Sequence, residues 1–185
     1  MRRDDSAALL VRNAKGSALV AARDLPAGAV VARLEGKLVP LASVPPEEVR
    51  HALWFDTDRW MIPTSPGRHI NHSCDPNCEL RDCPEDPDAC DAVTTRPVAA
   101  GEELTFGYDR IDADEYYANL GNPLYRFWHP DWSFDCLCGA PNCRGRIDGY
   151  VLVGDIEGAR RRHPAGAGYA EPIPGADRSP SARGK

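Results

Sequence analysis

The sequence predicts a mainly β protein, built from several small sheets with few short helices. Short runs rich in β-branched and aromatic residues recur along the chain, and turn signals of Gly, Pro and Asp separate them at close spacing. Long helical segments do not alternate with these runs, which argues against a doubly wound α/β fold. The 185 residues, of which 42% are hydrophobic, are sufficient for one domain with its own core.

Six runs are predicted to be strands, because each is short, rich in apolar or β-branched residues and bounded by turn residues. In chain order they are residues 17–22, 29–36, 52–55, 59–62, 91–98 and 103–106. Residues 25–28 (LPAG) have the Pro and Gly of a tight turn, and residues 65–67 (SPG) repeat this chemistry further on. Such turns favour strands that are joined by short connections.

Only two segments have the pattern of a helix. Residues 45–53 (PPEEVRHAL) begin with proline and carry acidic residues in the first turn, and residues 112–120 (DADEYYANL) are the second candidate. From residue 163 onward, Pro, Gly, Ala and Ser dominate and large apolar residues are few. We therefore expect the C-terminal tail to be disordered from about residue 164.

The composition limits the classes of partner and compartment. A net charge of −6 argues against broad binding to nucleic-acid phosphates and permits a basic partner. The first residues lack an apolar run of signal-peptide length, and no stretch approaches the length of a membrane span. We therefore expect a soluble intracellular protein, cytoplasmic if its source is bacterial, without membrane association or direct nucleic-acid binding. We also expect a monomer.

The seven cysteines favour metal binding over disulfides, because the expected compartment is reducing and an odd number cannot pair completely. The segment FDCLCGAPNCRGRI places Cys136, Cys138 and Cys143 in a C-x-C-x4-C pattern, in which the backbone can turn around one ion at Gly139. Tetrahedral zinc needs one more ligand. The cysteines that remain to supply it are Cys74, Cys78, Cys83 and Cys90.

Two other interpretations of the cysteines stay open on spacing alone. The three C-terminal cysteines can form a reduced cluster without a metal. The other four, at positions 74, 78, 83 and 90, can form a second zinc site, although gaps of three, four and six residues are less typical of a compact zinc knuckle.

Three segments follow one another along the chain: RHINHSCDPNC (68–78), GEELTFGYD (101–109) and CLCGAPNCRG (136–145). Upstream, residues 15–39 contain a Lys-Gly turn and then a predicted hairpin with a Leu-Pro-Ala-Gly corner. Together, over about residues 10–147, they resemble the SET-domain protein lysine methyltransferases that have a zinc-binding post-SET segment. The resemblance implies the SET-domain fold, with the Asn-His-Ser-Cys segment threaded, knot-like, through a loop beside the Gly-Glu-Glu-Leu-Thr strand.

The resemblance also implies a domain organisation and a ligand set. The implied parts are an N-terminal extension (1–9), the SET domain (10–110), a connection with the post-SET segment (111–147) and a C-terminal extension (148–185). In the family, the Cys of the Asn-His-Ser-Cys motif completes the zinc site. The implied zinc ligands are therefore Cys74, Cys136, Cys138 and Cys143. Cys78 is implied to be structural and not a ligand.

The implied reaction transfers the methyl group of S-adenosylmethionine to the ε-amine of a lysine in a histone or another basic protein. Tyr108 matches the catalytic tyrosine of the family. The positions that match the cofactor site are Lys15, Gly16, Ser17, Arg68, Asn71, His72, Tyr108, Phe134 and Leu137.

The implied lysine channel is lined by Trp54, Phe55 and Phe106. The flat faces of Trp54 and Phe55 suit an alkyl stem and a cationic head, but plain core packing is an open alternative for both. Phe106 matches a position where Phe and Tyr alternate in the family. A Phe leaves room for an amine that already carries a methyl group, which implies di- or trimethylation.

Two other functions stay open. A catalytically silent SET-like module would bind a peptide or the cofactor without turnover, but the intact Tyr108, Asn71 and His72 argue against it. A zinc-dependent structural or interaction protein would explain the cysteines but not the four ordered segments.

Overall fold

The computed structural model describes residues 7–13, 16–55, 59–119 and 128–164 of the chain. They belong to two compact units. The first unit consists of the chain up to Gly107 together with Cys138–Cys143, and the second of Tyr108–Leu137 together with the chain from Arg144 onward. Short strands dominate and the helices are few and short, so the predicted mainly β class is confirmed.

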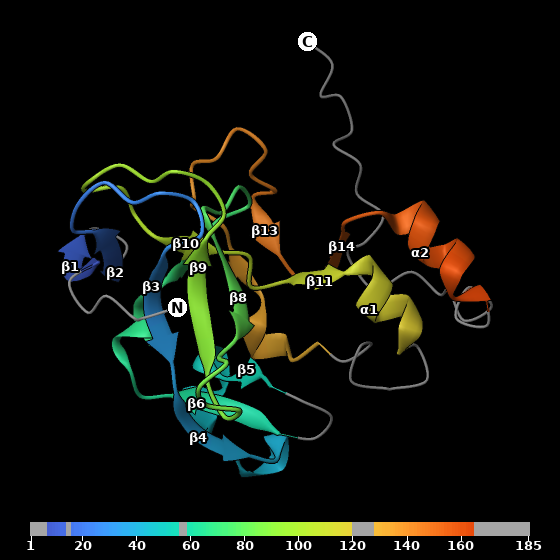
Figure 1. The fold of residues 1–185 in the computed structure, drawn as a ribbon. Helices are drawn as coiled ribbons and strands as arrows, with labels where there is room; N and C mark the ends of the chain where they lie inside the picture. The colour runs from blue at the N-terminus through green and yellow to red at the C-terminus, as the bar shows by residue number, and fades with distance from the viewer. Residues whose placement is uncertain (1–6, 14–15, 56–58, 120–127, 165–185) are drawn as a thin grey trace. The chain divides into compact units, whose positions relative to one another are not determined.

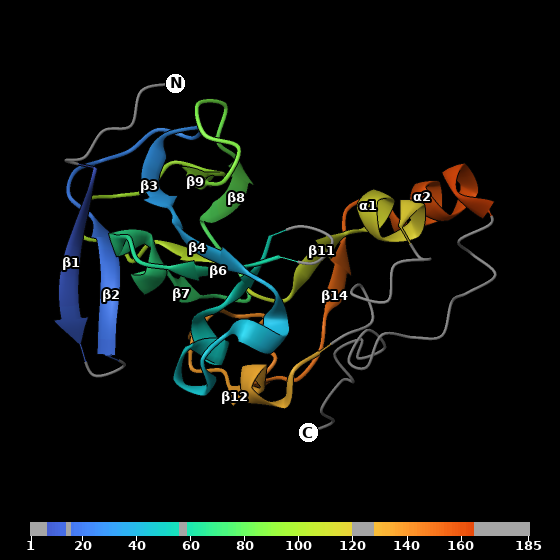
Figure 2. The same cartoon turned by 90° about the horizontal axis from the view of Figure 1, so that it is seen from below.

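Two antiparallel sheets of the first unit use strands with apolar, β-branched sequences. β1 (Ala8–Asn13) pairs with β2 (Gly16–Ala21) over the full length of both strands, as Figure 2 shows. β9 (Cys90–Thr94) lies between β3 (Val30–Leu34) and β8 (Cys78–Asp82) (Figure 1). Four of the five residues of β9 are buried, as expected for the central strand of a sheet packed on a core.

Two further sheets of the first unit are built from shorter strands. β6 (Trp60–Pro63) pairs antiparallel with both β4 (Gly36–Val39) and β5 (Leu53–Trp54). β7 (Asn71–His72) and β10 (Thr105–Phe106) pair parallel, although they are separated by the whole β8–β9 hairpin in the sequence. A parallel pair of this kind needs a long crossover, which the hairpin supplies.

The core of the first unit fixes where β7 and β10 begin. Its largest fully buried side chains are Leu19, Leu34, Met61, Ile70 and Leu104. Ile70 directly precedes β7, and Leu104 directly precedes β10 and donates its backbone N–H to the carbonyl of Leu19 (2.8 Å). Burying an aliphatic side chain of this size contributes about 1.5–3 kcal/mol. Each short strand is therefore held at its first residue by the core.

The second unit contains two further strand pairs. β11 (Arg110–Asp112) pairs parallel with β14 (Val151–Val153), and β12 (Phe134–Asp135) pairs antiparallel with β13 (Arg146–Ile147). Ile147 is fully buried. The C-x-C-x4-C segment is the connection between β12 and β13.

The two α-helices of the described second unit have aspartate caps at their N-termini. Asp112 precedes α1 (Ala113–Ala118) and accepts from the backbone N–H of Asp114 (2.9 Å), and Asp155 precedes α2 (Ile156–Arg162) and accepts from that of Gly158 (2.9 Å). Such caps satisfy donors that a helix start leaves unpaired. The described 3-10 helices are η1 (Leu41–Ser43), η2 (Pro46–His51), η3 (Pro66–His69) and η5 (Pro130–Trp132).

Every predicted strand segment overlaps a strand of the structure, and the predicted helix at 112–120 contains α1. Within the predicted helix at 45–53, Pro46–His51 form the 3-10 helix η2 and not an α-helix, and Leu53 begins β5. The predicted segments did not include the helix α2, most of β4, or the strands β1, β7, β8, β11, β12, β13 and β14. Residues 165–185 of the predicted disordered tail lie outside the described residues. No helix among the described residues is long and apolar enough to cross a membrane.

Gly36→Ala should destabilise the first unit, because a Cβ at this position would lie 2.0 Å from the carbonyl oxygen of Ile62 on β6. The backbone must shift, and overpacking of this kind costs about 1–3 kcal/mol. Urea denaturation should show this loss of unfolding free energy. Lys37→Ala, at the next and exposed position of β4, is the control and should change it by less than about 0.5 kcal/mol. Equal midpoints for the two variants would contradict the described β4–β6 pairing.

Candidate functional site

The pairing of β7 with β10 places two of the sequence motifs side by side. Asn71 lies opposite Thr105, and His72 lies opposite Phe106. Directly after β7, the backbone N–H of Ser73 donates to the carbonyl of Phe106 (3.2 Å). The Asn-His-Ser segment and the Thr-Phe segment are therefore joined by main-chain hydrogen bonds. The predicted knot-like threading around this pair stays a prediction.

The side chain of Asn71 adds a third segment to this pair. Its amide nitrogen donates to the carbonyl of Ser17 on β2 (3.1 Å) and to Oε1 of Glu103 (2.8 Å). Gly16, which precedes Ser17, has a φ of 114°, a conformation that a residue with a Cβ rarely adopts. Lys15 lies outside the described residues. One half-buried amide thus connects the predicted cofactor positions at 16–17 and 71.

Asn77 is a residue that the sequence analysis did not identify. It is buried, and its amide nitrogen donates to Oε1 of Glu102 (2.9 Å) and to the carbonyl of Glu103 (2.8 Å). Its amide oxygen accepts from the backbone N–H of Thr105 (2.9 Å). Both the nitrogen and the oxygen of the Asn77 amide therefore hydrogen-bond to the backbone at the start of β10. The sequence marks it only as a turn former, and no local pattern signals this long-range role.

The carboxylate of Glu102 belongs to the same network. Arg96 donates to Oε1 of Glu102 (2.7 Å), and this hydrogen bond is the main reason that the pKa of the carboxyl lies below its ordinary value. Asn77 and the backbone N–H of Ala99 lower the pKa further by donating to the same carboxylate. Glu102 is thus ionised at neutral pH and serves as a structural acceptor.

The four cysteines of the predicted zinc site lie together. The Sγ atoms of Cys74, Cys136, Cys138 and Cys143 are all within 4.8 Å of one another. Because a Zn–S bond is about 2.3 Å long, sulfurs at the corners of a tetrahedron around zinc lie about 3.8 Å apart. The spacing of the four sulfurs therefore fits a tetrahedral metal site with little adjustment.

Hydrogen bonds position Cys74 within this cluster. Its backbone N–H donates to Sγ of Cys138 (3.5 Å), and Asn142 donates to its carbonyl (3.3 Å). The Nε2 atom of His72 lies 3.5 Å from Sγ of Cys74. The C-terminal cysteines turn at Gly139, which has a φ of 76°, and the turn is closed by the N–H of Cys143 donating to Ala140 (2.9 Å). The loop geometry predicted from the C-x-C-x4-C spacing is present.

The other three cysteines do not form a second such group within the described residues. Burial raises the pKa of Cys78 to about 12 and that of Cys90 to about 11. Both thiols are therefore protonated at neutral pH as the protein stands. Cys78 packs in the core of the first unit. The alternative zinc site built from positions 74, 78, 83 and 90 is therefore not supported.

The aromatic and apolar candidates of the second unit are Tyr108, Phe134 and Leu137. The ring of Phe134 meets the ring of Tyr108 edge to face, with 6.1 Å between the centroids. Tyr108 is 39% exposed, and Leu137, between two of the clustered cysteines, is 74% exposed. Large apolar side chains at such exposure are available to a bound molecule.

The remaining candidates have structural contacts in the first unit. Arg68 on η3 forms an ion pair with Glu48 (3.1 Å). Phe55 packs against the core cluster, and the guanidinium of Arg59 lies 5.6 Å from its ring centroid. Trp54 is half-buried on β5, and Phe106 is buried in the core cluster. The roles predicted for Trp54, Phe55 and Phe106 in a lysine channel stay predictions.

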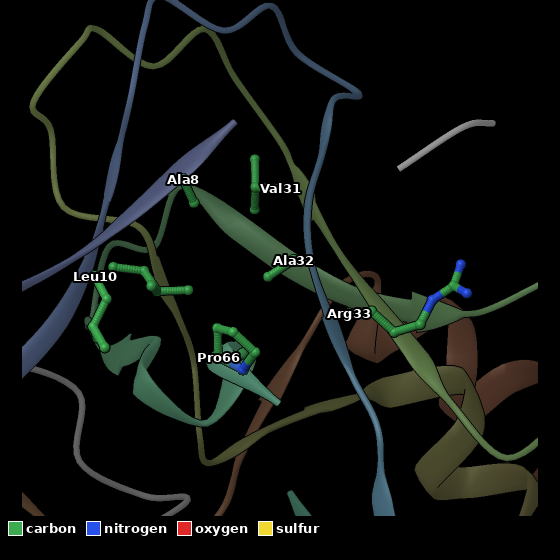
Figure 3. Close-up of a pocket in the computed structure, with 8 residues that line it drawn as sticks. Ala8, Leu10, Val31, Ala32, Arg33 and Pro66 are labelled. Carbon is green, nitrogen blue, oxygen red and sulfur yellow. The ribbon is translucent and has the colours of Figure 1, made fainter. Parts of the chain in front are cut away.

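The first unit also contains a small pocket, and none of the predicted site residues lines it. It has a volume of about 160 Å³ and is lined by Ala8, Leu10, Leu19, Val31, Ala32, Arg33, Pro66 and Gly67. In Figure 3 the Arg33 side chain points away from Leu10 and Pro66. Its guanidinium donates to Asp91 (3.0 Å) and Glu85 (3.1 Å). The charged side chain of the pocket lining is thus held by two acids, and the pocket is not the candidate site.

A family model of the SET domain matches residues 16–109, just over half of the chain. The chain belongs to the SET-domain family. The matched stretch begins at the glycine of β2 and ends one residue after Tyr108, and it lies within the predicted domain at 10–110.

Curated relatives of this SET-domain protein carry the name histone-lysine N-methyltransferase. ASHH2 of Arabidopsis thaliana is 33% identical over 91 residues, which is 49% of this chain and 4% of that protein. An H3 lysine-36 specific enzyme of Cryptococcus neoformans is 29% identical over 148 residues, 73% of this chain and 16% of that protein. The chain thus spans only a small part of the length of these relatives.

The structural comparison agrees with the family assignment. The crystal structure of KRYPTONITE in complex with mCHH DNA, an H3(1-15) peptide and SAH matches with a TM-score of 0.56 and 24% sequence identity. The match covers 79% of this chain and 30% of that one. At this identity the likeness establishes the fold, and the predicted SET-domain fold is therefore confirmed.

Asn77→Ala should destabilise the first unit, because it leaves the buried N–H of Thr105 and carbonyl of Glu103 without their side-chain partner. Each buried polar group left unsatisfied costs about 1–3 kcal/mol. Thermal and chemical unfolding should both register the loss. Asn119→Ala, which removes an exposed amide that donates to a helix carbonyl, is the control and should have a much smaller effect. If the two variants are equally stable, Asn77 does not hold β10 as described.

Proposed function

We propose that this protein is a protein lysine N-methyltransferase that uses S-adenosylmethionine. The observation that carries the proposal is the joining of β7, with its Asn-His sequence, to the strand that leads into Tyr108, within the stretch that matches the SET-domain family. The names of the relatives support the same reaction. The substrate is a lysine in a histone or another basic protein or peptide, and the net charge of −6 is compatible with such a partner.

S-adenosylmethionine, when bound, supplies a methyl group on a positively charged sulfur. The backbone at Gly16, Ser17, Asn71 and His72 is the proposed binding surface for it. Because the amide of Asn71 is already bonded to Ser17 and Glu103, this side chain acts by fixing the backbone. Phe134 and Leu137 offer apolar surface for the adenine, and the exposure of Leu137 supports this role.

The residues of the chain must also present a neutral lysine amine. Deprotonating a lysine of ordinary pKa at pH 7 costs about 4–5 kcal/mol. Apolar walls such as Trp54 and Phe106 disfavour the charged ammonium and recover part of this cost. Tyr108 is the proposed catalytic residue, because its hydroxyl can orient the amine and its lone pair at the reacting atoms. A strong general base is then not required.

We propose that Cys74, Cys136, Cys138 and Cys143 bind one zinc ion. The fit of the four sulfurs to a tetrahedral site supports this assignment. A metal here closes the loop that carries Leu137 onto Cys74. The role of the zinc is structural, because four protein thiolates leave no open position for a substrate.

The function is tested by incubating the purified protein with S-adenosylmethionine labelled in its methyl group, together with core histones or a cell lysate. Mass spectrometry should then find labelled methyl groups on lysine side chains. Binding of the cofactor in calorimetry, without transfer to any lysine, would contradict the proposal and identify a catalytically silent binding module.

The zinc assignment predicts about one zinc per chain in metal analysis by mass spectrometry. Cys74→Ser should remove most of this zinc, because only three thiolates would remain. Cys78→Ser is the control and should keep it, since that thiol packs in the core. Zinc retained by the first variant and lost by the second would refute the ligand set.

Tyr108→Phe should keep the affinity for S-adenosylmethionine within about twofold and lower kcat about a hundredfold, because the ring remains while the orienting hydroxyl is lost. Titration calorimetry and a rate assay measure the two effects separately. Tyr117→Phe, which removes a phenol hydroxyl that accepts from Arg160 of α2 (2.7 Å), is the control. A folded Tyr108→Phe variant with a normal kcat would exclude the catalytic role.

The identity of residue 106 predicts how many methyl groups are transferred to one lysine. Because its ring lacks a hydroxyl that could hold the amine or a water, a methylated lysine has room to turn for a second transfer. The wild-type protein should therefore form di- or trimethyllysine, and Phe106→Tyr should shift the product toward monomethyllysine. Mass spectrometry of a peptide substrate under excess cofactor measures both distributions. An unchanged distribution in the variant would mean that other parts of the channel set the limit.

A further inference from the structure

The residue that follows Tyr108 is a fully buried acid. The side chain of Asp109 has no exposed surface, and its Oδ2 accepts a hydrogen bond from Nη2 of Arg144 in an ion pair. Its Oδ1 has no hydrogen-bond partner among the described residues. A buried carboxylate is costly unless a cation balances it, so Asp109 depends on Arg144.

The main chain of Asp109 is held as firmly as its side chain. The backbone N–H of Val151 donates to the carbonyl of Asp109 (2.8 Å), and Val151 is also the partner of Arg110 in the β11–β14 pair. Figure 2 shows β11 and β14 running beside each other. The chain directly after Tyr108 is therefore fixed by an ion pair and by a strand pair, while the Tyr108 ring itself is partly exposed.

Arg144 balances the charge of Asp109, and neither Tyr150 nor Arg146 takes this place. Tyr150 is buried nearby, and its burial, together with the negative charge of Asp109, raises the pKa of this phenol to about 12. Tyr150 is thus neutral at physiological pH and cannot balance a charge. Arg144 comes from the segment directly after Cys143, whereas Arg146, two residues on, forms exposed ion pairs with Asp135 (2.9 Å) and Asp148 (3.9 Å).

We propose that Asp109 and Arg144 form a positioning pair that sets the direction of the Tyr108 side chain at the reacting atoms; this role rests on the proposed methyltransferase function. The Cα–Cβ direction of Tyr108 depends on the backbone at residues 108 and 109, and the pair holds that backbone. An error of about 1 Å in the position of a catalytic group can lower a rate about a hundredfold. Neither residue needs to touch substrate or cofactor.

The planar guanidinium of Arg144 matters for this role as well as its charge. Its fork of donors has a fixed geometry, while a lysine ammonium is a point charge on a flexible stem. Arg144→Lys should therefore keep the fold but lower kcat at least about tenfold, with the KM for peptide changed by less than about twofold. Arg146→Lys, the matched change at the exposed pair, should leave both constants unchanged.

A double variant separates positioning from stability. Asp109→Asn combined with Arg144→Met removes both charges, so no uncompensated buried charge remains and the melting temperature should return toward that of the wild type. If the pair acts by positioning, kcat stays low in this folded variant. Recovery of kcat together with the melting temperature would overturn the proposal, because the pair would then contribute only to folding.

A spectroscopic readout makes the test independent of turnover. Protein labelled with 3-fluorotyrosine gives one fluorine resonance for Tyr108, which is assigned by its absence in Tyr108→Phe. We expect this resonance to shift or broaden in Arg144→Lys and in the double variant, and to be unchanged in Arg146→Lys. An unchanged Tyr108 resonance in the double variant would overturn the proposal. A shifted resonance in a protein whose wild type transfers no methyl group would support the positioning of Tyr108 and refute the proposed function.

Discussion

The parallel pairing of β7 with β10 is the contact on which the candidate site depends. Each strand has only two residues, and so short a parallel pair has too few main-chain hydrogen bonds to be stable alone. Fully buried residues anchor the start of each strand, and two asparagine amides complete the hydrogen bonding around them. If the pair separates, the Asn-His segment loses its position beside the strand that leads to Tyr108.

The hydrogen bonds made by Asn71 and Asn77 need the chemistry of an amide side chain. A buried amide offers donors and an acceptor without a charge, so it can bridge a carboxylate, a carbonyl and an N–H at the same time. Asn77 does this for Glu102, Glu103 and Thr105. An aspartate at this position would lose the donors and face the carboxylate of Glu102. The network is therefore specific to amide side chains.

The C-x-C-x4-C loop supplies three of the four clustered sulfurs, and the fourth comes from Cys74, far earlier in the chain. β12 ends directly before Cys136, β13 begins directly after Gly145, and the N–H of Cys136 donates to the carbonyl of Gly145 (2.9 Å). The base of the loop is thus closed without a metal ligand from elsewhere. Cys74 brings the fourth sulfur to the loop, so binding of the proposed metal would be coupled to the folding of the loop.

The sequence by itself determined six strand segments, the turns and the three-cysteine loop, because these features depend on residues that are close in the chain. Its ordered motifs also predicted the family, which the family model confirms, and through the family the grouping of Cys74 with the three C-terminal cysteines. Only the tertiary structure showed that Asn77 holds β10, that Phe55 packs on the core under Arg59, and that Asp109 is buried against Arg144. The residue types in these contacts are common in turns, in strands and on surfaces, so they give no signal of the contacts in the sequence. Their roles depend on burial and, for Asn77 and Asp109, on partners distant in the chain, and neither is encoded in a local pattern.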